Sequence, residues 1–410
     1  MPHRAAGFAL TLLLIEFLDE FVFGAREAAW PLIRTDLGLS YAQIGLLLGV
    51  PGIVSSIVEP LFGIIGDTGR RRALVLGGGL AFGLALVLLG LSNGYGWLLV
   101  SFILLYPASG AFVSLSQASL MDLEPTRHEV NMARWTFAGS LGVVLGPLAL
   151  GVGAALGWGW RSIFLGLAGL TAPIVAAAFR FPFRTPAAAG SAGGAAVAPE
   201  VQSAGEPPVT LAGTLVAGAR DVAQALARGE VRRWLVLLQL ADLMLDVLLG
   251  YLALYLVDVG GVSPAQATAG VAVWTGFGLL GDFLMIPLLA RVRGLDYLRV
   301  SAVVELLLFS GFLLVPSFAI RLGLLALLGL LNAGWYAILQ AQLYTAMPGR
   351  SGTALAVNNV FGLAGSLVPW GIGLVAERFS LQAAMWLLCL GPVALIVGLR
   401  SQRHLQSIEV

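Results

Sequence analysis

Long apolar segments, separated by short polar breaks, recur along the whole chain. A helix needs about 20 mostly apolar residues to cross the hydrocarbon core of a bilayer. Twelve stretches meet this requirement, near 7–30, 41–65, 73–91, 96–120, 131–155, 161–181, 232–256, 265–290, 297–316, 321–345, 352–375 and 380–399. The pattern predicts an all-α polytopic membrane protein with twelve transmembrane helices, whose outer faces contact the lipid bilayer.

One connection is far longer than the others. Most breaks, such as 92–94, leave room only for a tight turn, so consecutive helices are expected to pack as antiparallel neighbours. Residues 182–231 are the exception. Their low-complexity part, 185–209, consists mostly of Ala, Gly, Pro, Ser and Val, a composition typical of a flexible linker. We therefore predict two six-helix bundles, 1–181 and 232–410, joined by a cytoplasmic linker.

Arginine is distributed unevenly between the two ends of the predicted helices. The chain has 23 basic residues, all of them arginine. If the N-terminus is cytoplasmic, 18 arginines fall on the cytoplasmic side and five on the other, which is the bias that sets the orientation of helical membrane proteins. This predicts a multi-pass protein of the inner (plasma) membrane with both termini in the cytoplasm.

Composition and charge narrow the function classes. Only 11% of the 410 residues are charged, whereas a soluble domain has roughly 25%. The net charge of +1 gives no reason to expect a nucleic-acid partner. The three histidines lie outside the apolar segments, Cys389 is the single cysteine, and no phosphate-binding loop motif is present. We therefore expect no enzyme, no cofactor and no resident metal centre.

The two halves of the chain repeat each other at a nearly constant offset. Chance explains any one match, but five matches in the same order indicate a duplication, and two six-helix halves related by a pseudo-two-fold axis along the membrane normal are expected from it. The matched pairs are Asp19 with Asp246, Ser40 and Gln43 with Ser263 and Gln266, Glu59 with Asp282, Gly110 with Gly334, and 138–141 with 364–367.

A short motif follows the second apolar segment. The stretch from Gly63 to Arg72 reads GIIGDTGRRR and resembles the signature G-x-x-x-D-x-x-G-R-R of the major facilitator superfamily. Glycine at these positions allows close helix approach and a tight turn. The resemblance implies a transporter fold and an inner gate formed by Gly63, Asp67, Gly69, Arg70 and Arg71.

A second motif lies in the fifth segment. Gly142, Gly146 and Pro147 resemble the Gly- and Pro-rich motif of the drug-efflux antiporter branches. The same residues also suit a helix that merely bends and packs closely. Drug-efflux members usually have R-x-x-x-G in segment four, but counting back from Gly110 places Tyr106 at the arginine position.

Carboxylates interrupt several apolar segments. An ionisable side chain near the bilayer centre costs roughly 2.5–3.5 kcal/mol and usually faces a cavity or a partner. Asp19 and Asp246 are central and related by the repeat, so they are the first candidates for proton coupling or substrate binding. The further candidates are Glu16, Glu20, Asp242 and Glu305. Glu59 and Asp282 lie nearer the segment ends, where a gate contact with arginine is an alternative.

No arginine is expected at the middle of a segment, so the embedded charge is read as acidic and uncompensated. Three interpretations follow: the carboxyls are protonated, they bind a cationic substrate or metal, or they do both in alternation. An anionic substrate is disfavoured because no cavity arginine is evident. Neutral polar candidates for the cavity wall are Gln117, Asn332, Tyr336, Gln340 and Asn358, although an interfacial belt is an alternative for the aromatic residues.

The leading hypothesis is a monomeric, proton-coupled exporter, an antiporter that removes small organic compounds, cationic or amphipathic in character, by alternating access and so supports drug resistance. The acidic segment centres and the antiporter-like motif favour it. An uptake symporter for a sugar or peptide, a divalent-metal carrier of the same fold, and a non-transporting receptor or scaffold are the alternatives.

Overall fold

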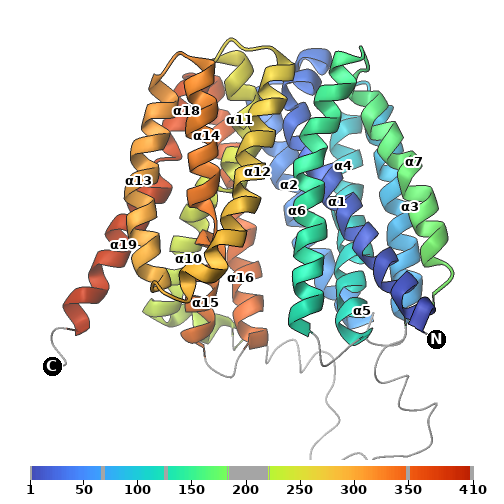
Figure 1. The fold of residues 1–410 in the computed structure, drawn as a ribbon, viewed down its shortest axis with the longest axis horizontal. Helices are drawn as coiled ribbons and strands as arrows, with labels where there is room; N and C mark the ends of the chain where they lie inside the picture. The colour runs from blue at the N-terminus through green and yellow to red at the C-terminus, as the bar shows by residue number, and fades with distance from the viewer. Residues whose placement is uncertain are drawn as a thin grey trace, which may run out of the picture.

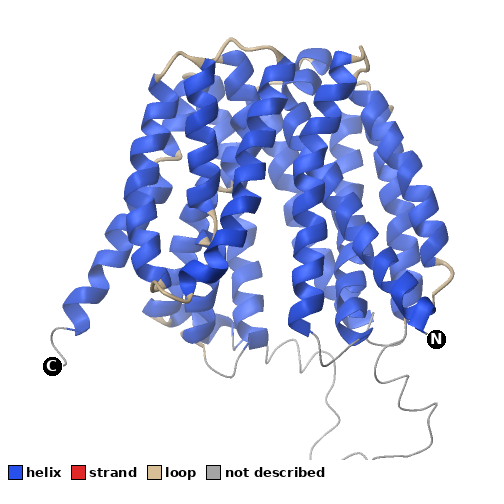
Figure 2. Ribbon diagram, in the orientation of Figure 1, coloured by secondary structure: helices blue, strands red, loops and turns tan. Residues whose placement is uncertain are grey.

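The computed structural model describes residues 2–65, 70–123, 128–181, 183, 220, 222–347 and 351–406. Within these residues the chain consists of helices and connecting loops, without a β-strand (Figure 2). Two helical bundles stand side by side, and the helices of both run roughly along one common axis (Figure 1).

The N-terminal bundle contains six predicted spans. Span four is divided among a first helix, a π-helical turn and a second helix, and the other five are continuous. The elements are α1 (Pro2–Leu37), α2 (Tyr41–Ile65), α3 (Arg71–Gly90), α4 (Tyr95–Ser109), η2 (Gly110–Ser114), α5 (Leu115–Leu123), α6 (His128–Ala155) and α7 (Trp160–Ala178).

The C-terminal bundle also contains six spans, but four of them are interrupted. The elements are α10 (Gly229–Ala241), η4 (Asp242–Met244) and α11 (Asp246–Asp258) in span seven, α12 (Pro264–Leu289), α13 (Gly294–Leu314), α14 (Phe318–Asn332) and α15 (Trp335–Thr345) in span ten, α16 (Ser351–Gly365) and α17 (Val368–Arg378) in span eleven, and α18 (Leu381–Leu387) and α19 (Leu390–Gln406) in span twelve.

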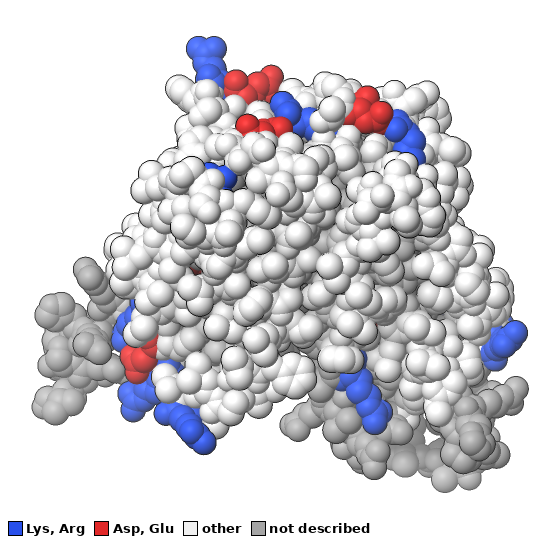
Figure 3. All heavy atoms as spheres, turned by 45° about the horizontal axis from the view of Figure 1, so that its top comes forward, with Lys and Arg blue, Asp and Glu red and all other residues white. Residues whose placement is uncertain are grey.

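The predicted fold class is confirmed. Eleven helical segments of the described chain are long and apolar enough to cross a bilayer. α1 is the twelfth span, a helix of 36 residues that contains several ionisable side chains. On the face shown in Figure 3, an uncharged belt separates charged residues at the two ends of the bundle, as a surface facing lipid requires.

The internal repeat has a structural counterpart at the starts of spans two and eight. Ser40 and Gln43 bond each other's backbone N–H groups, at 2.9 and 3.2 Å. Ser263 and Gln266 form the same reciprocal pair, at 3.0 and 3.2 Å. Both are capping boxes, which satisfy N–H groups that a helix start leaves free.

The repeat extends to two glycines at which a helix departs from regular geometry. Gly110 begins the π-helical turn of span four and lies against the Glu59 side chain. Gly334, with φ +76°, separates α14 from α15, and its backbone N–H interacts with the Asp282 carboxylate. Glycine tolerates this left-handed conformation without steric cost. In each half a carboxylate therefore approaches the irregular turn of the neighbouring span.

Helices α1 and α6 cross at very short range inside the N-terminal bundle. A Cβ atom on Gly24 would meet the backbone of Val143, and one on Gly142 or Gly146 would meet the backbone of α1. The glycines of the antiporter-like motif thus allow two backbones to touch, which small residues do at helix interfaces in membranes. This contact fixes the face that α1 presents to the centre of the molecule.

The bundles are joined at the end opposite the one where α1 begins and α19 ends, which is the top of Figure 1. There, Asp258 of α11 accepts hydrogen bonds from Arg34 of α1 at 3.0 Å and from the Tyr41 hydroxyl at 2.8 Å. Glu377 of α17 accepts from the backbone N–H of Ala42 at 3.2 Å. We call this set of contacts the closed end.

Glycines bring the same two bundles into backbone contact just below the closed end. A Cβ on Gly45 would meet Pro369 and Trp370, one on Gly49 would meet Ser366, and one on Gly373 would meet Tyr41. Helices α2 and α17 therefore touch along their backbones. The gate-motif residues Asp67 and Gly69, and the low-complexity segment 185–209, lie outside the described residues, so these predictions stay predictions.

We expect Gly24→Ala to destabilise the protein by about 1–3 kcal/mol, because the added methyl group has no space against Val143. The measurement is the melting temperature of purified protein in detergent. Gly166→Ala is the matched control, since Gly166 has open space around its Cβ position. Equal melting temperatures for the two variants would contradict the close crossing of α1 and α6.

Candidate functional site

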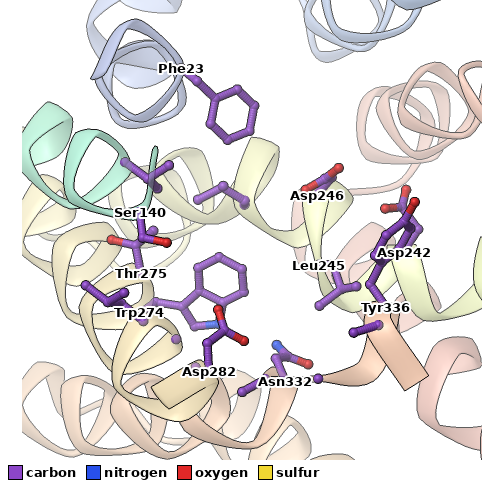
Figure 4. A pocket seen from close by; sticks show the side chains of 18 residues that line it. Phe23, Ser140, Asp242, Leu245, Asp246, Trp274, Thr275, Asp282, Asn332 and Tyr336 are labelled. Carbon is purple, nitrogen blue, oxygen red and sulfur yellow. The ribbon is translucent and has the colours of Figure 1, made fainter. Parts of the chain in front are cut away.

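A cavity of about 540 Å³ lies between the two bundles near the middle of the helices. Its wall comes mostly from spans seven, eight and ten, and Phe23 of α1 and Ser140 of α6 close it from the N-terminal side (Figure 4). Two smaller pockets, of about 360 and 170 Å³, adjoin it and share lining residues with their neighbours. The three form one central cavity, within the size range of small-molecule sites.

The break in span seven positions two carboxylates on this cavity. Asp242 begins the 3₁₀ turn that follows α10, and Asp246 begins α11. Both line the 540 Å³ and the 360 Å³ pockets, and Asp246 is exposed to the cavity. An anion at a helix N-terminus is favoured by the helix dipole. The start of α11 therefore favours the charged form of Asp246.

A second acidic group lies in the N-terminal bundle. Asp19 and Glu59 line the 170 Å³ pocket together with Ser55 and Ser109. The Ser55 hydroxyl donates to Glu59 at 2.5 Å, and the Ser109 hydroxyl interacts with Asp19. The repeat-related residues Asp19 and Asp246 thus face connected pockets from opposite bundles. Within the described residues, neither forms an ion pair.

Between these acidic groups lies Arg26, whose side chain is buried in the bundle with only 6% of the residue exposed. Its guanidinium is paired with Glu27 and donates to the Tyr106 hydroxyl at 2.7 Å. The Glu27 carboxylate also accepts a hydrogen bond from the Trp30 indole N–H at 2.9 Å. The guanidinium also lies over the Phe23 ring, 4.8 Å from its centroid, a favourable cation–π geometry.

Arg26 corrects the sequence-based expectation that no arginine lies within the membrane part of the bundle. α1 continues to Leu37, so Arg26 lies 11 residues before its end, or about 16 Å along the axis. The argument against anionic substrates, which assumed an all-acidic cavity, therefore loses its premise. The helix runs through Pro31, a residue that usually ends or kinks a helix, and stops only at Gly38, where φ is +62°.

The hydrogen bond between Arg26 and Tyr106 places the arginine next to a motif position in span four. Tyr106 stands where drug-efflux relatives usually have arginine, and here its hydroxyl binds the guanidinium of Arg26 from α1. A cation therefore lies beside this place in span four, although a different helix supplies it. Arg26 acts electrostatically on Asp19 and Glu20 of its own bundle. At Asp246 its attraction is opposed by a larger repulsion from its partner Glu27.

The other carboxylates of α1 point elsewhere. Glu16 is buried against Gly139 of α6, and Glu20 lies against Gly142 and Gly139. Neither lines one of the three pockets that form the central cavity. The three acidic residues that sequence periodicity placed on one arc are thus divided, with Asp19 on the central pocket and the other two at the α1–α6 contact.

Of the neutral polar candidates, three line the central cavity and two do not. Tyr336 lines the two larger pockets, Asn358 lines the 360 Å³ pocket, and Asn332 lines the largest. Gln117 instead donates to the Met132 sulfur, at 3.7 Å. Gln340 is partly buried, and its Oε1 has no hydrogen-bond partner. Asp282 and the unpredicted Trp274 complete the wall, and the Trp274 indole N–H is unpaired.

Glu305 does not reach the cavity. It lies on α13 with 0% of its surface exposed and interacts with Asn332, which itself lines the cavity. In the described part of the chain, no group of three or more His, Cys, Asp and Glu residues is arranged to hold a metal ion.

Comparison with known proteins identifies the family. The profile of the Major Facilitator Superfamily matches residues 12–369. A chloramphenicol resistance protein of Pseudomonas aeruginosa is 33% identical over 183 residues, which is 44% of this chain and 43% of that relative. The matched stretch therefore spans less than half of that protein. The chain belongs to the major facilitator superfamily, and it is a multi-pass membrane protein.

Solved structures show the same fold. A bacterial homologue of the human lysosomal transporter Spinster, in an inward-facing and unoccupied conformation, aligns with a TM-score of 0.71 at 18% identity, covering 96% of this chain and 94% of that one. The nucleoside transporter NupG aligns with a TM-score of 0.73 at 15% identity, covering 96% and 98%. A D-xylose–proton symporter aligns at 0.71 and 16%, covering 95% and 97%.

We expect Arg26→Gln to destabilise the protein by about 3–5 kcal/mol, because it leaves the Glu27 charge buried without its cation. The double variant Arg26→Gln with Glu27→Gln should recover most of this loss. Melting temperatures in detergent, compared in a double-mutant cycle, provide the measurement. Asp296→Asn, at an exposed ion pair, is the control and should cost at most about 1 kcal/mol. Additive losses in the double variant would contradict the pairing.

Proposed function

We propose that the protein exports small organic compounds of cationic or amphipathic character in exchange for protons. The observation that supports this most is the exposure of Asp242 and Asp246 to a central cavity that also has aromatic walls. Carboxylates attract a cationic group, and the faces of Phe23, Trp274 and Tyr336 suit an apolar or cationic body. The partial similarity to a chloramphenicol resistance protein favours the export direction.

Proton exchange is proposed at Asp19 and Asp246. A buried carboxylate without a bound cation is costly in the bilayer, so either a proton or the cationic group of a substrate neutralises it. Arg26 reduces this cost at Asp19. At Asp246 the repulsion from Glu27, which is paired with Arg26, outweighs the attraction of the guanidinium, so that carboxylate needs another cation or a proton. Competition between proton and substrate at the same acid then couples their opposite movements.

The closed end supports alternating access by rocking of the two bundles. Its contacts join α1 and α2 to α11 and α17, so they must separate for the cavity to open at that end. With both termini in the cytoplasm, as the arginine distribution favours, the closed end is the outer one. The structure then corresponds to an inward-facing state, ready to receive a compound from the cytoplasm.

For Asp246→Asn, and likewise for Asp19→Asn, we expect substrate-driven proton release to fall to background while the protein stays folded. A thermal-shift screen of organic cations at two pH values first identifies a ligand. Proton release is then followed with a pH indicator in weakly buffered detergent solution. Asp296→Asn, on the surface, should release protons like the wild type. Full coupled transport in both cavity variants would exclude these roles.

The direction of transport requires its own measurement, because an uptake symporter of the same fold would also couple solute to protons. Proteoliposomes with an imposed pH gradient distinguish the two: an antiporter accumulates the compound against the proton flow, and a symporter accumulates it with the flow. Accumulation with the proton flow would replace export by uptake.

Asp258→Asn should raise the population ratio of the alternative state, in which the contacts of the closed end are broken, by about two- to fivefold. This is the change expected for loss of a partly exposed ion pair. The substitution weakens the contacts with both Arg34 and Tyr41. Spin labels at Thr35→Cys and Val259→Cys, in a Cys389→Ser background, report the distance across this end. We expect a larger long-distance population than in the Asp296→Asn control, and an unchanged distribution would contradict the gating role.

A further inference from the structure

A groove of about 350 Å³ lies on the outer side of the N-terminal bundle, apart from the central cavity. Its walls are one face of α3 and one face of α7, the helix at the right-hand edge of Figure 1. Small residues such as Gly83, Ala172 and Ala176 keep it open, and its described lining contains no charged side chain. A groove of this composition on the outside of a membrane bundle faces lipid chains.

An arginine lies at the end of this groove that is opposite the closed end. Arg72 comes two helical turns before Gly79 and therefore shares the groove face of α3. Its guanidinium donates to the carbonyl of Phe179 at 2.9 Å, and Phe179 is the last groove residue of α7. Arg180, with an exposed side chain, follows directly. Arg72 thus connects the two walls at the mouth of the groove, and Arg180 lies beside it.

The other end of the same helix pair has a matching arginine. Arg161 of α7 donates to the carbonyl of Ser92, just after α3, at 2.7 Å, as Arg72 donates to a carbonyl just after α7. Arg161 also forms an ion pair with Asp36. The two arginines are placed alike, but only Arg161 has a carboxylate partner in the described part of the chain. The N–H groups that Arg72 does not use on the carbonyl can still donate to an anion.

Positive charge gathers around the mouth of the groove. Arg70, Arg72 and Arg180 are exposed, and none of them forms an ion pair with the residues that the structure describes. α3 begins here, so the partial positive charge of its N-terminus adds to theirs. If this end is cytoplasmic, as the arginine distribution favours, the mouth lies at the headgroups of the inner leaflet, where arginine can bind phosphate with two parallel hydrogen bonds.

We propose that this groove is a binding site for an anionic phospholipid of the cytoplasmic leaflet. One acyl chain lies between α3 and α7, and the phosphate binds Arg72 and Arg180. Charge decides among the possible occupants, because a transmembrane helix of a second copy covers the apolar walls but gives the arginines no phosphate. A zwitterionic lipid brings a second cation, which the arginines repel. The site lies outside the central cavity and does not depend on the proposed export function.

Native mass spectrometry of the purified full chain tests the headgroup. The two probes are dioleoyl phosphatidylglycerol and dioleoyl phosphatidylcholine, which have identical chains. The wild type should bind one phosphatidylglycerol about tenfold more tightly than phosphatidylcholine, because two arginines lie near its anionic headgroup. The double variant Arg72→Gln with Arg180→Gln should lose this preference. Arg293→Gln, an exposed arginine at the same end of the C-terminal bundle, is the control and should retain it.

Equal binding of the two lipids by the wild type, or an unchanged preference in the double variant, would overturn the proposal. The melting temperature provides a second readout. Phosphatidylglycerol should raise it more than phosphatidylcholine does in the wild type and in Arg293→Gln, but not in the double variant. If inorganic phosphate alone raises it equally, the arginines bind a soluble anion and the lipid site is excluded.

The apolar part of the site is tested without a change of charge. Ala172→Leu with Ala176→Leu fills the groove and should weaken phosphatidylglycerol binding about fivefold, because the acyl chain loses buried methylene contacts. Gly166→Leu, on the same helix but outside the groove and with open space around its Cβ position, should bind like the wild type. Undiminished binding by the filled variant would exclude the groove. A dimer that the filled variant alone loses would assign the groove to a second copy and also overturn the lipid.

Discussion

The pairing of Arg26 with Glu27 inside an apolar bundle is the constraint on which the cavity depends. A guanidinium stays charged at every accessible pH, so burying it requires an anion, hydrogen-bond acceptors and aromatic faces around it. Glu27, Tyr106 and Phe23 supply these from α1 and α4. The same cation then reduces the cost of placing Asp19 nearby. An acidic cavity without it would have to keep more of its carboxyls neutral.

Much of the fold could be predicted from the sequence, because spans of about 20 apolar residues have few alternatives to crossing a membrane. The repeat was also readable, since Ser40 and Ser263 cap their helices through the same reciprocal contacts. The interruption of span seven could not be predicted, because residues 240–246 contain neither glycine nor proline. Its irregular turn is stabilised from another span, by Asn332, and a contact of that kind leaves no local signal.

The site was predicted less completely, for a related reason. Sequence spacing shows which residues share a helix face but not the direction in which that face points. Asp19, Asp242, Asp246 and Tyr336 do line the central pockets, whereas Glu16 and Glu20 face α6 because glycines there allow α1 to approach. The first apolar segment was ended near residue 30, before Pro31, which left Arg26 close to its end although α1 continues to Leu37. The acidic interpretation of the cavity followed from that error.

Glycine contacts of two kinds occur in this molecule, and their mechanical consequences differ. The crossing of α1 and α6 joins helices of one bundle, whereas Gly45, Gly49 and Gly373 lie between α2 and α17 of different bundles. A backbone seam of this second kind has few interlocked side chains to disengage when the bundles part, and few rotamers to restore when they meet again. In the proposed rocking motion, the barrier to separating α2 from α17 is therefore low at this seam.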